Sequence, residues 1–76
     1  MKLTSDQKWW KTKALQHAKT AVEAASNFEF EVGHLGTSEA QGGLDSEEAR
    51  KEILAQLKAA KAALISAEDW LDKVFS

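Results

Sequence analysis

The sequence predicts an all-α fold: residues 1–76 form a single domain, an antiparallel two-helix hairpin with a long connection, assembled as a homo-oligomeric helical bundle. Apolar residues recur at alternating spacings of four and three over residues 5–26 and again over residues 46–75, the pattern of helices that pack lengthwise. Many of the apolar residues are alanines, so the chain can bury only a thin core. We therefore expect further copies of the chain to cover the apolar residues that lie off the shared stripe, namely Leu54, Ile65 and Trp9.

The first helix is expected over residues 5–26. Thr4 and Gln7 have the spacing of a capping box, and Asp6 suits the positive end of the helix dipole. Leu15, Ala18, Val22 and Ala25 broaden the apolar side of this helix, whose central stripe contains Trp10, Ala14, His17, Ala21, Ala24 and Phe28.

The connection is expected over residues 27–45. Phe28, Phe30 and Val32 alternate with two glutamates, and this period of two predicts a short extended segment with one apolar face. Glycines at 33, 36, 42 and 43 then mark turns. Because a lone strand is not stable in water, the segment should lie over the helices or pair with a neighbouring subunit. A lid, a strand and an interface are all compatible with this pattern.

The second helix is expected over residues 46–75. Asp45 and Glu48 can form its N-terminal cap, with Leu44 and Ala49 as a hydrophobic staple. Its stripe, which includes Leu64 as a predicted core residue, contains Ile53, Leu57, Ala60, Leu64, Ala67, Leu71 and Val74. Alanines on both stripes allow the two backbones to approach closely, as suits an antiparallel pair.

Composition excludes several classes of protein. There is no cysteine, which excludes disulfides and thiolate chemistry. No apolar run approaches the roughly 20 residues of a membrane span, and the N-terminus lacks the apolar segment of a signal peptide. A net charge of −2 is too small for nucleic-acid binding by the surface as a whole. We expect a cytoplasmic protein that binds neither membrane nor long nucleic acid.

The residue pattern gives no positive signal for catalysis, and we expect neither an enzyme nor a bound cofactor. His17 and His34 are not at a metal-ligand spacing with each other or with a carboxylate cluster, so no metal site is expected. Adjacent acids, such as Glu68 and Asp69, point to different sides of a helix and do not form a facing catalytic pair.

Aromatic and basic residues gather at the open end of the predicted hairpin. Antiparallel folding brings together Trp9, Trp10, Trp70 and Phe75 with Lys8, Lys11, Lys13 and Lys73. Indole rings beside ammonium groups can stack a base and neutralise a phosphate. The same residues also suit a plainer interpretation, in which the rings belong to the core and the lysines form a solvated rim.

One helix carries a resemblance to a known family. Over residues 57–73 the chain has Leu57, Ala60, Lys61, Leu64, Ala67, Trp70 and Lys73, a pattern that resembles the second hairpin helix of the phage anti-CBASS cyclic-nucleotide sponge family, a hairpin shared with a family of anti-Thoeris sponges. The resemblance implies a small helical protein of compact homo-oligomers in the host-cell cytoplasm. Such proteins sequester cyclic di- or trinucleotides or related immune signals in pockets between protomers, without cleaving them.

Two functions follow as expectations. In the first, the chain is a phage-type sponge that holds a cyclic nucleotide or an ADP-ribose-type signal at subunit interfaces, with ligand contacts from Trp9, Lys13, Lys61, Trp70 and Lys73. In the second, it is a structural or adaptor hairpin, natural or designed, that docks a protein partner. Membrane-surface binding by the first helix is disfavoured, because its lysines do not face a wide band of large apolar residues.

Overall fold

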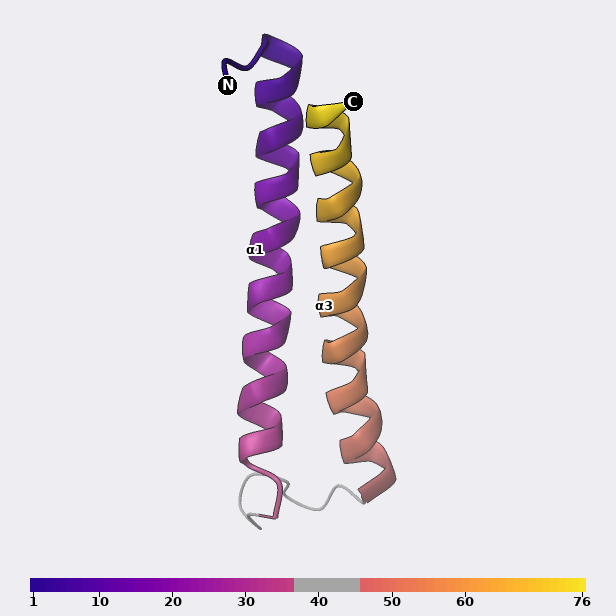
Figure 1. Ribbon diagram of the computed structural model, residues 1–76. Coiled ribbons are helices and arrows are strands. Elements are labelled where there is room, and N and C mark those ends of the chain that lie inside the picture. The colour runs from indigo at the N-terminus through magenta and orange to yellow at the C-terminus, as the bar shows by residue number, and fades with distance from the viewer. Residues whose placement is uncertain (37–45) are drawn as a thin grey trace.

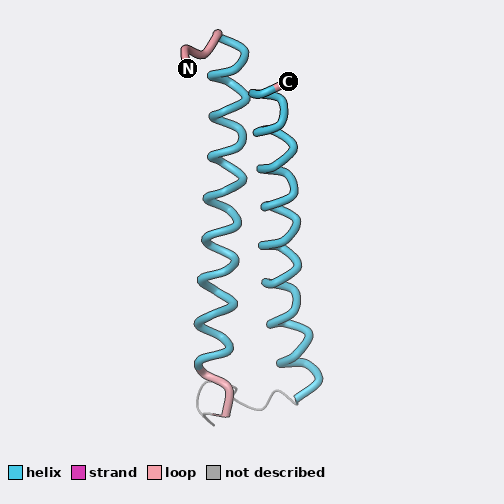
Figure 2. The backbone as a smooth tube through the Cα atoms, in the orientation of Figure 1, coloured by secondary structure: helices cyan, strands magenta, loops and turns pink. Residues whose placement is uncertain are grey.

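The computed structural model describes residues 1–36 and 46–76, which form two long helices lying side by side. These are α1 (Ser5–Gly33) and α3 (Ser46–Phe75), and they run in opposite directions, so that both ends of the chain lie at one end of the molecule (Figure 1). Figure 2 shows helix and turn, and no strand, over the described residues. The molecule is a rod with Cα extents of 53 × 16 × 13 Å. The predicted all-helical hairpin is confirmed.

The predicted start of α1 is also confirmed. The Thr4 hydroxyl accepts a hydrogen bond from the Gln7 backbone N–H at 3.2 Å, and the Gln7 side-chain oxygen accepts one from the Thr4 N–H at 2.8 Å. Because each partner satisfies a backbone donor that the first helical turn leaves free, the capping box fixes where the helix begins.

The end of α1 differs from the prediction, because the helix continues to Gly33 rather than stopping at 26. Phe28 continues the helical stripe of Ala21 and Ala24 and is half-buried, whereas Phe30 is 65% exposed. The period of two around Phe28 and Phe30 therefore does not form the predicted extended segment. No proline interrupts the stretch, and a helix pairs backbone groups that a lone strand would leave unpaired.

A turn of irregular backbone follows α1. The His34 N–H donates to the Phe30 carbonyl at 3.2 Å and to the Glu31 carbonyl at 3.3 Å, and the His34 ring lies against the Phe30 ring with centroids 4.1 Å apart. Gly36 has φ 84°, a left-handed conformation that glycine adopts without a Cβ clash. The expected cap of the second helix rests on Leu44 and Asp45, which lie outside the described residues.

The two helices meet along a stripe of small residues, which we call the contact stripe. Its α1 side is the predicted one, with Ala21 and Ala24 buried between the half-buried Trp10, Ala14, His17 and Phe28. Its α3 side contains Ala49, Ile53, Gln56, Ala60, Ala63, Ala67, Trp70 and Val74, all buried or half-buried. Alanine faces alanine along the middle of the hairpin, so the helices can approach closely.

The α3 prediction was wrong about which leucines lie in this stripe. Leu64 is 57% exposed and Leu71 is 49% exposed, although both were predicted to be core residues. The predicted and the observed stripe of α3 share Ile53, Ala60, Ala67 and Val74. The remaining contacts of the observed stripe are Ala49, Gln56, Ala63 and Trp70. The leucines lie on the flank of the hairpin instead.

The register of the two helices is fixed at the open end. The Gln7 side-chain amide donates to the Val74 backbone carbonyl at 2.9 Å. Further along, Ala14 and Ala67 line one groove between the helices. Near the connection, Phe28 and Ile53 line another. Neither α1 nor α3 is apolar enough over the length needed to cross a membrane.

Candidate functional site

The first of two lysine–tryptophan pairs lies on α1. The Lys13 ammonium is 4.9 Å from the centre of the Trp9 ring, in a cation–π arrangement. The two residues are four apart on a helix, which places their side chains one above the other. Trp9 is 54% exposed, so the pair lies at the surface and not in the core.

The second pair lies on α3, where the Lys73 ammonium is 4.5 Å from the centre of the Trp70 ring. Trp70 is half-buried in the contact stripe, whereas Lys73 is exposed in the last turn of the helix. A cation in the last turn interacts favourably with the negative end of the helix dipole. Packing therefore holds the ring, and the dipole favours the ammonium at this position.

Both pairs occupy one level and one face of the hairpin. The Gln7–Val74 hydrogen bond sets the level, because all four residues lie within about two helical turns of it. Leu15 and Leu71 line a single groove, and Lys13 and Lys73 stand two residues from them, about 160° around their helices. Both lysines thus project on the side opposite that groove. We call Trp9, Lys13, Trp70 and Lys73 the lysine–tryptophan face.

Lys61 is not brought to this face within one chain. It is exposed, and it precedes Trp70 by nine residues, which is about 180° around α3 and about 13 Å along it. It shares a side of the helix with Leu57 and Leu64, which stand four residues before it and three after it. Of the five predicted ligand residues, four share a face and Lys61 lies on the other.

That other side is an extensive apolar face, which prediction from sequence missed because the leucines were expected in the core. A groove of about 520 Å³ at the open end is lined by Leu15, Leu71 and Phe75, among others. A second groove, of about 440 Å³, lies near the connection. The residues that we call the apolar face are Leu15, Val22, Leu54, Leu57, Leu64, Leu71 and Phe75.

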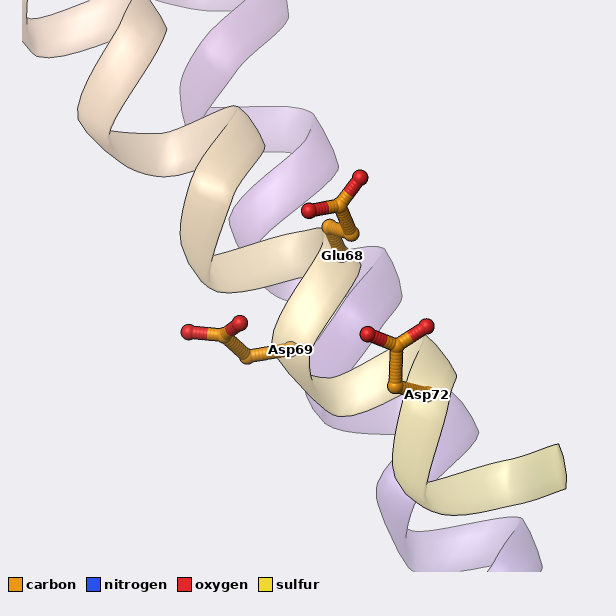
Figure 3. A group of neighbouring side chains, drawn as sticks. All are labelled: Glu68, Asp69 and Asp72. Carbon is orange, nitrogen blue, oxygen red and sulfur yellow. The ribbon is translucent and has the colours of Figure 1, made fainter. Parts of the chain in front are cut away.

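A group of three carboxylates stands on the outer surface of α3, turned away from α1 (Figure 3). Ligand oxygens of Glu68, Asp69 and Asp72 lie within 4.8 Å of one another. Glu68 and Asp69 were predicted to point to different sides of the helix, but their carboxylates approach each other on its outer surface, and Asp72, one turn further on, lies beside both. All three are exposed, and such groups are common on helix surfaces without a bound cation, so they are not assigned a metal.

The two histidines lie in different parts of the hairpin. His17 is half-buried in the contact stripe, and the His34 Nδ1 lies 2.8 Å from the Phe30 carbonyl oxygen beyond the end of α1. His17 follows Lys13 by four residues, so it lies one turn beyond the lysine–tryptophan face, whereas His34 lies at the other end of the hairpin.

The hairpin thus presents a lysine–tryptophan face on one side and an apolar face on the other. Comparison with protein-family models, with curated proteins and with solved structures gives no match to this chain.

Proposed function

We propose that the protein is a non-catalytic sponge that sequesters a cyclic nucleotide or a related signal, such as an ADP-ribose derivative. The observation that carries the proposal is the placing of two ammonium–indole pairs at one level of one face, Lys13 with Trp9 and Lys73 with Trp70. Two cations suit a ligand with two phosphates, and two aromatic rings suit a ligand with two bases.

The chemistry of binding combines charge and stacking. Phosphate oxygens accept charge-assisted hydrogen bonds from ammonium groups, and a base stacked on an aromatic side chain contributes about 1–3 kcal/mol. A base must use the ring face that the lysine does not cover, or displace the ammonium from it. Binding without turnover is proposed because the four side chains of the lysine–tryptophan face are ammonium groups and indole rings, neither of which is a general base.

One neighbouring residue opposes anion binding. Asp69 directly precedes Trp70 and lies four residues before Lys73, so its carboxylate shares a side of the helix with that lysine. Its charge should repel a phosphate at the same place. Asp69→Asn should therefore tighten binding, a change opposite in sign to that of every lysine variant.

Calorimetry with a panel of cyclic di- and trinucleotides and ADP-ribose derivatives tests the proposal. At least one ligand should bind more tightly than about 100 μM, equivalent to about −5.5 kcal/mol. Lys13→Ala and Lys73→Ala should each weaken its binding by about 1.5–3 kcal/mol, the range for a hydrogen bond to a charged group. Lys58→Ala is the matched control, because Lys58 is an exposed lysine of α3 distant from the proposed contacts.

Two results would count against the sponge. The first is a panel in which no ligand reaches the stated affinity, and the second is recovery of a hydrolysed ligand after incubation. Lys61 is not part of the proposed site, because it stands on the far side of α3 from Trp70.

A second function, docking of a protein partner by an adaptor hairpin, is favoured by the apolar face. Leu64 and Phe75 are 57% and 69% exposed, and apolar residues at heptad-like spacings are the anchors by which helices lie in grooves. The nucleotide panel separates the two functions, since the adaptor gives no signal with any member.

A further inference from the structure

The apolar face runs the length of the hairpin as two parallel stripes. On α1, Lys11, Leu15, Ala18, Val22, Ala25 and Glu29 follow one another at alternating spacings of four and three, and on α3 the same spacings join Leu54, Leu57, Lys61, Leu64, Glu68, Leu71 and Phe75. Each helix therefore has two adjacent stripes, one for the other helix of the hairpin and one without a neighbour in the described chain. Helices with two such stripes are those of a four-helix bundle.

We propose that a second copy of the chain packs on the apolar face, around a two-fold axis parallel to the helices. The α1 of each copy then lies over the α3 of the other, and both connections lie at one end of an antiparallel four-helix bundle. This proposal does not depend on any ligand of the lysine–tryptophan face.

The area of the face suits a stable dimer. The hairpin has extents of 53 and 16 Å, whose product is about 850 Å², and a standard interface buries about 800 Å² on each partner. The accessible surface of the hairpin is 5877 Å², whereas a compact monomer of 8.4 kDa has about 4,600 Å². The excess of about 1,270 Å² is larger than the roughly 800 Å² that one such interface removes from each partner, so the hairpin has enough surplus surface for it.

Charges on the face are complementary in this pairing. Lys11 and Glu68 border the same groove at the open end, and Arg50 borders the groove near the connection, where Glu29 follows the lining residue Phe28. When α1 lies over the α3 of the second copy at the same level, Lys11 meets Glu68 and Glu29 meets Arg50. Opposite charges then alternate around the bundle at both levels.

Lys61 and the sizes of the side chains select this orientation over the reversed one, in which each helix lies on its own copy. Lys61 stands at the middle of α3, so a reversed α3 pair would bring two Lys61 ammonium groups together. In the proposed pairing Lys61 meets the stretch of α1 around Ala18 and Val22 instead. The leucines of α3 then also face the smaller residues of α1, which keeps the helices evenly spaced.

Sedimentation at micromolar concentrations gives the first test. Wild type should have twice the chain mass of 8.4 kDa. Leu64→Lys should shift it to the monomer mass, whereas Ile65→Lys should leave the dimer intact, because Ile65 is equally exposed, at 62%, but points away from the face. A wild-type monomer, a larger oligomer, or the same mass for both variants would overturn the proposal.

A charge exchange gives a second test that does not depend on a core change. Lys11→Glu and Glu68→Lys should each weaken self-association, and mixing the two variants should restore a dimer that contains one copy of each. The reversed orientation pairs Lys11 with Glu29 and places Glu68 about one turn from Arg50, so neither variant would gain a complementary partner from the other and the mixture would gain nothing. Failure of the mixture to associate more strongly than either variant overturns the proposed orientation.

The absence of cysteine allows a direct distance measurement. Ser5→Cys carries a single spin label on the exposed side of the open end. The proposed bundle brings the two labels to about 30 Å, whereas the reversed one separates them by about 45 Å or more, from the helix rise and interaxial distance. A long distance in a protein of dimer mass would rule out the parallel axis.

Discussion

At the scale of single residues, alanine determines how the helices meet. Ala21 is 4% exposed, and Ala60 and Ala63 are each 6% exposed; among the larger apolar side chains of the described chain, only Val74, at 5%, is buried as deeply. A methyl group allows close approach of two helical backbones but contributes little apolar area. The interior of the hairpin is therefore closely packed but buries little apolar area.

Ala21→Leu tests this packing. The larger side chain has no space between close helices, so the free energy of unfolding should fall by about 1–3 kcal/mol, the usual cost of overpacking. Ala62→Leu is the control, because Ala62 is exposed on the same kind of helix and its change should stay within about 0.5 kcal/mol. Urea unfolding followed by circular dichroism measures both, and equal values would show that the contact stripe is misplaced.

At the scale of elements, the longer α1 has a consequence for the stretch after 26. Glu29 is exposed and lies inside the helix, where its N–H joins the backbone ladder. Glu29→Pro should therefore cost about 3 kcal/mol or more, since proline removes that donor and clashes with the preceding turn. Glu29→Ala controls for loss of the carboxylate and should keep the helix. Equal helical signals for the two variants would contradict a helix at Glu29 and support the extended segment predicted from the sequence.

The sequence was sufficient for what depends on local spacing and insufficient for what depends on a neighbour. The Thr4–Gln7 cap and the α1 stripe were predicted correctly. So were the ends at which Trp9 and Trp70 lie. On α3, however, a spacing of four and three fits the alanine stripe and the leucine stripe equally, and apolar size favoured the leucines. Which stripe the hairpin uses depends on how closely α1 can approach, and periodicity does not contain that quantity.

The candidate site divides in the same way. Spacings of four and three residues are enough to predict the Lys13–Trp9 and Lys73–Trp70 contacts from the sequence. The sequence spacing also places Lys61 about half a revolution of α3 away from Trp70. The apolar face could not be predicted in this way, because it consists of the apolar side chains of α3 that α1 leaves uncovered, together with their neighbours on α1.

At the scale of the whole molecule, the hairpin is extended. Its Cα radius of gyration is 17.0 Å, compared with about 11 Å for a compact domain of this length. An extended rod buries little of its apolar surface, so much of its stability should come from association. The melting temperature should then rise with protein concentration, because binding of the folded chain to itself stabilises it by mass action.

Thermal melts over a hundred-fold range of concentration measure this rise. Leu64→Lys should melt at a temperature that does not change with concentration, and Ile65→Lys should behave as the wild type does. A wild-type melting temperature that is independent of concentration would mean that the single hairpin is stable by itself.

The alanine stripe also leaves the hairpin with a problem of alignment. Sliding α3 along α1 by about one turn moves Ala63 and Ala67 to the places of Ala60 and Ala63, so the middle of the contact by itself offers little resistance to such a slip. Resistance comes from the ends, where Trp10 and Phe28 have no alanine equivalent and the Gln7 amide meets one particular carbonyl, that of Val74. Because the alanine contacts at the middle of the rod are alike, the alignment of the two helices is set by the distinct side chains at its two ends.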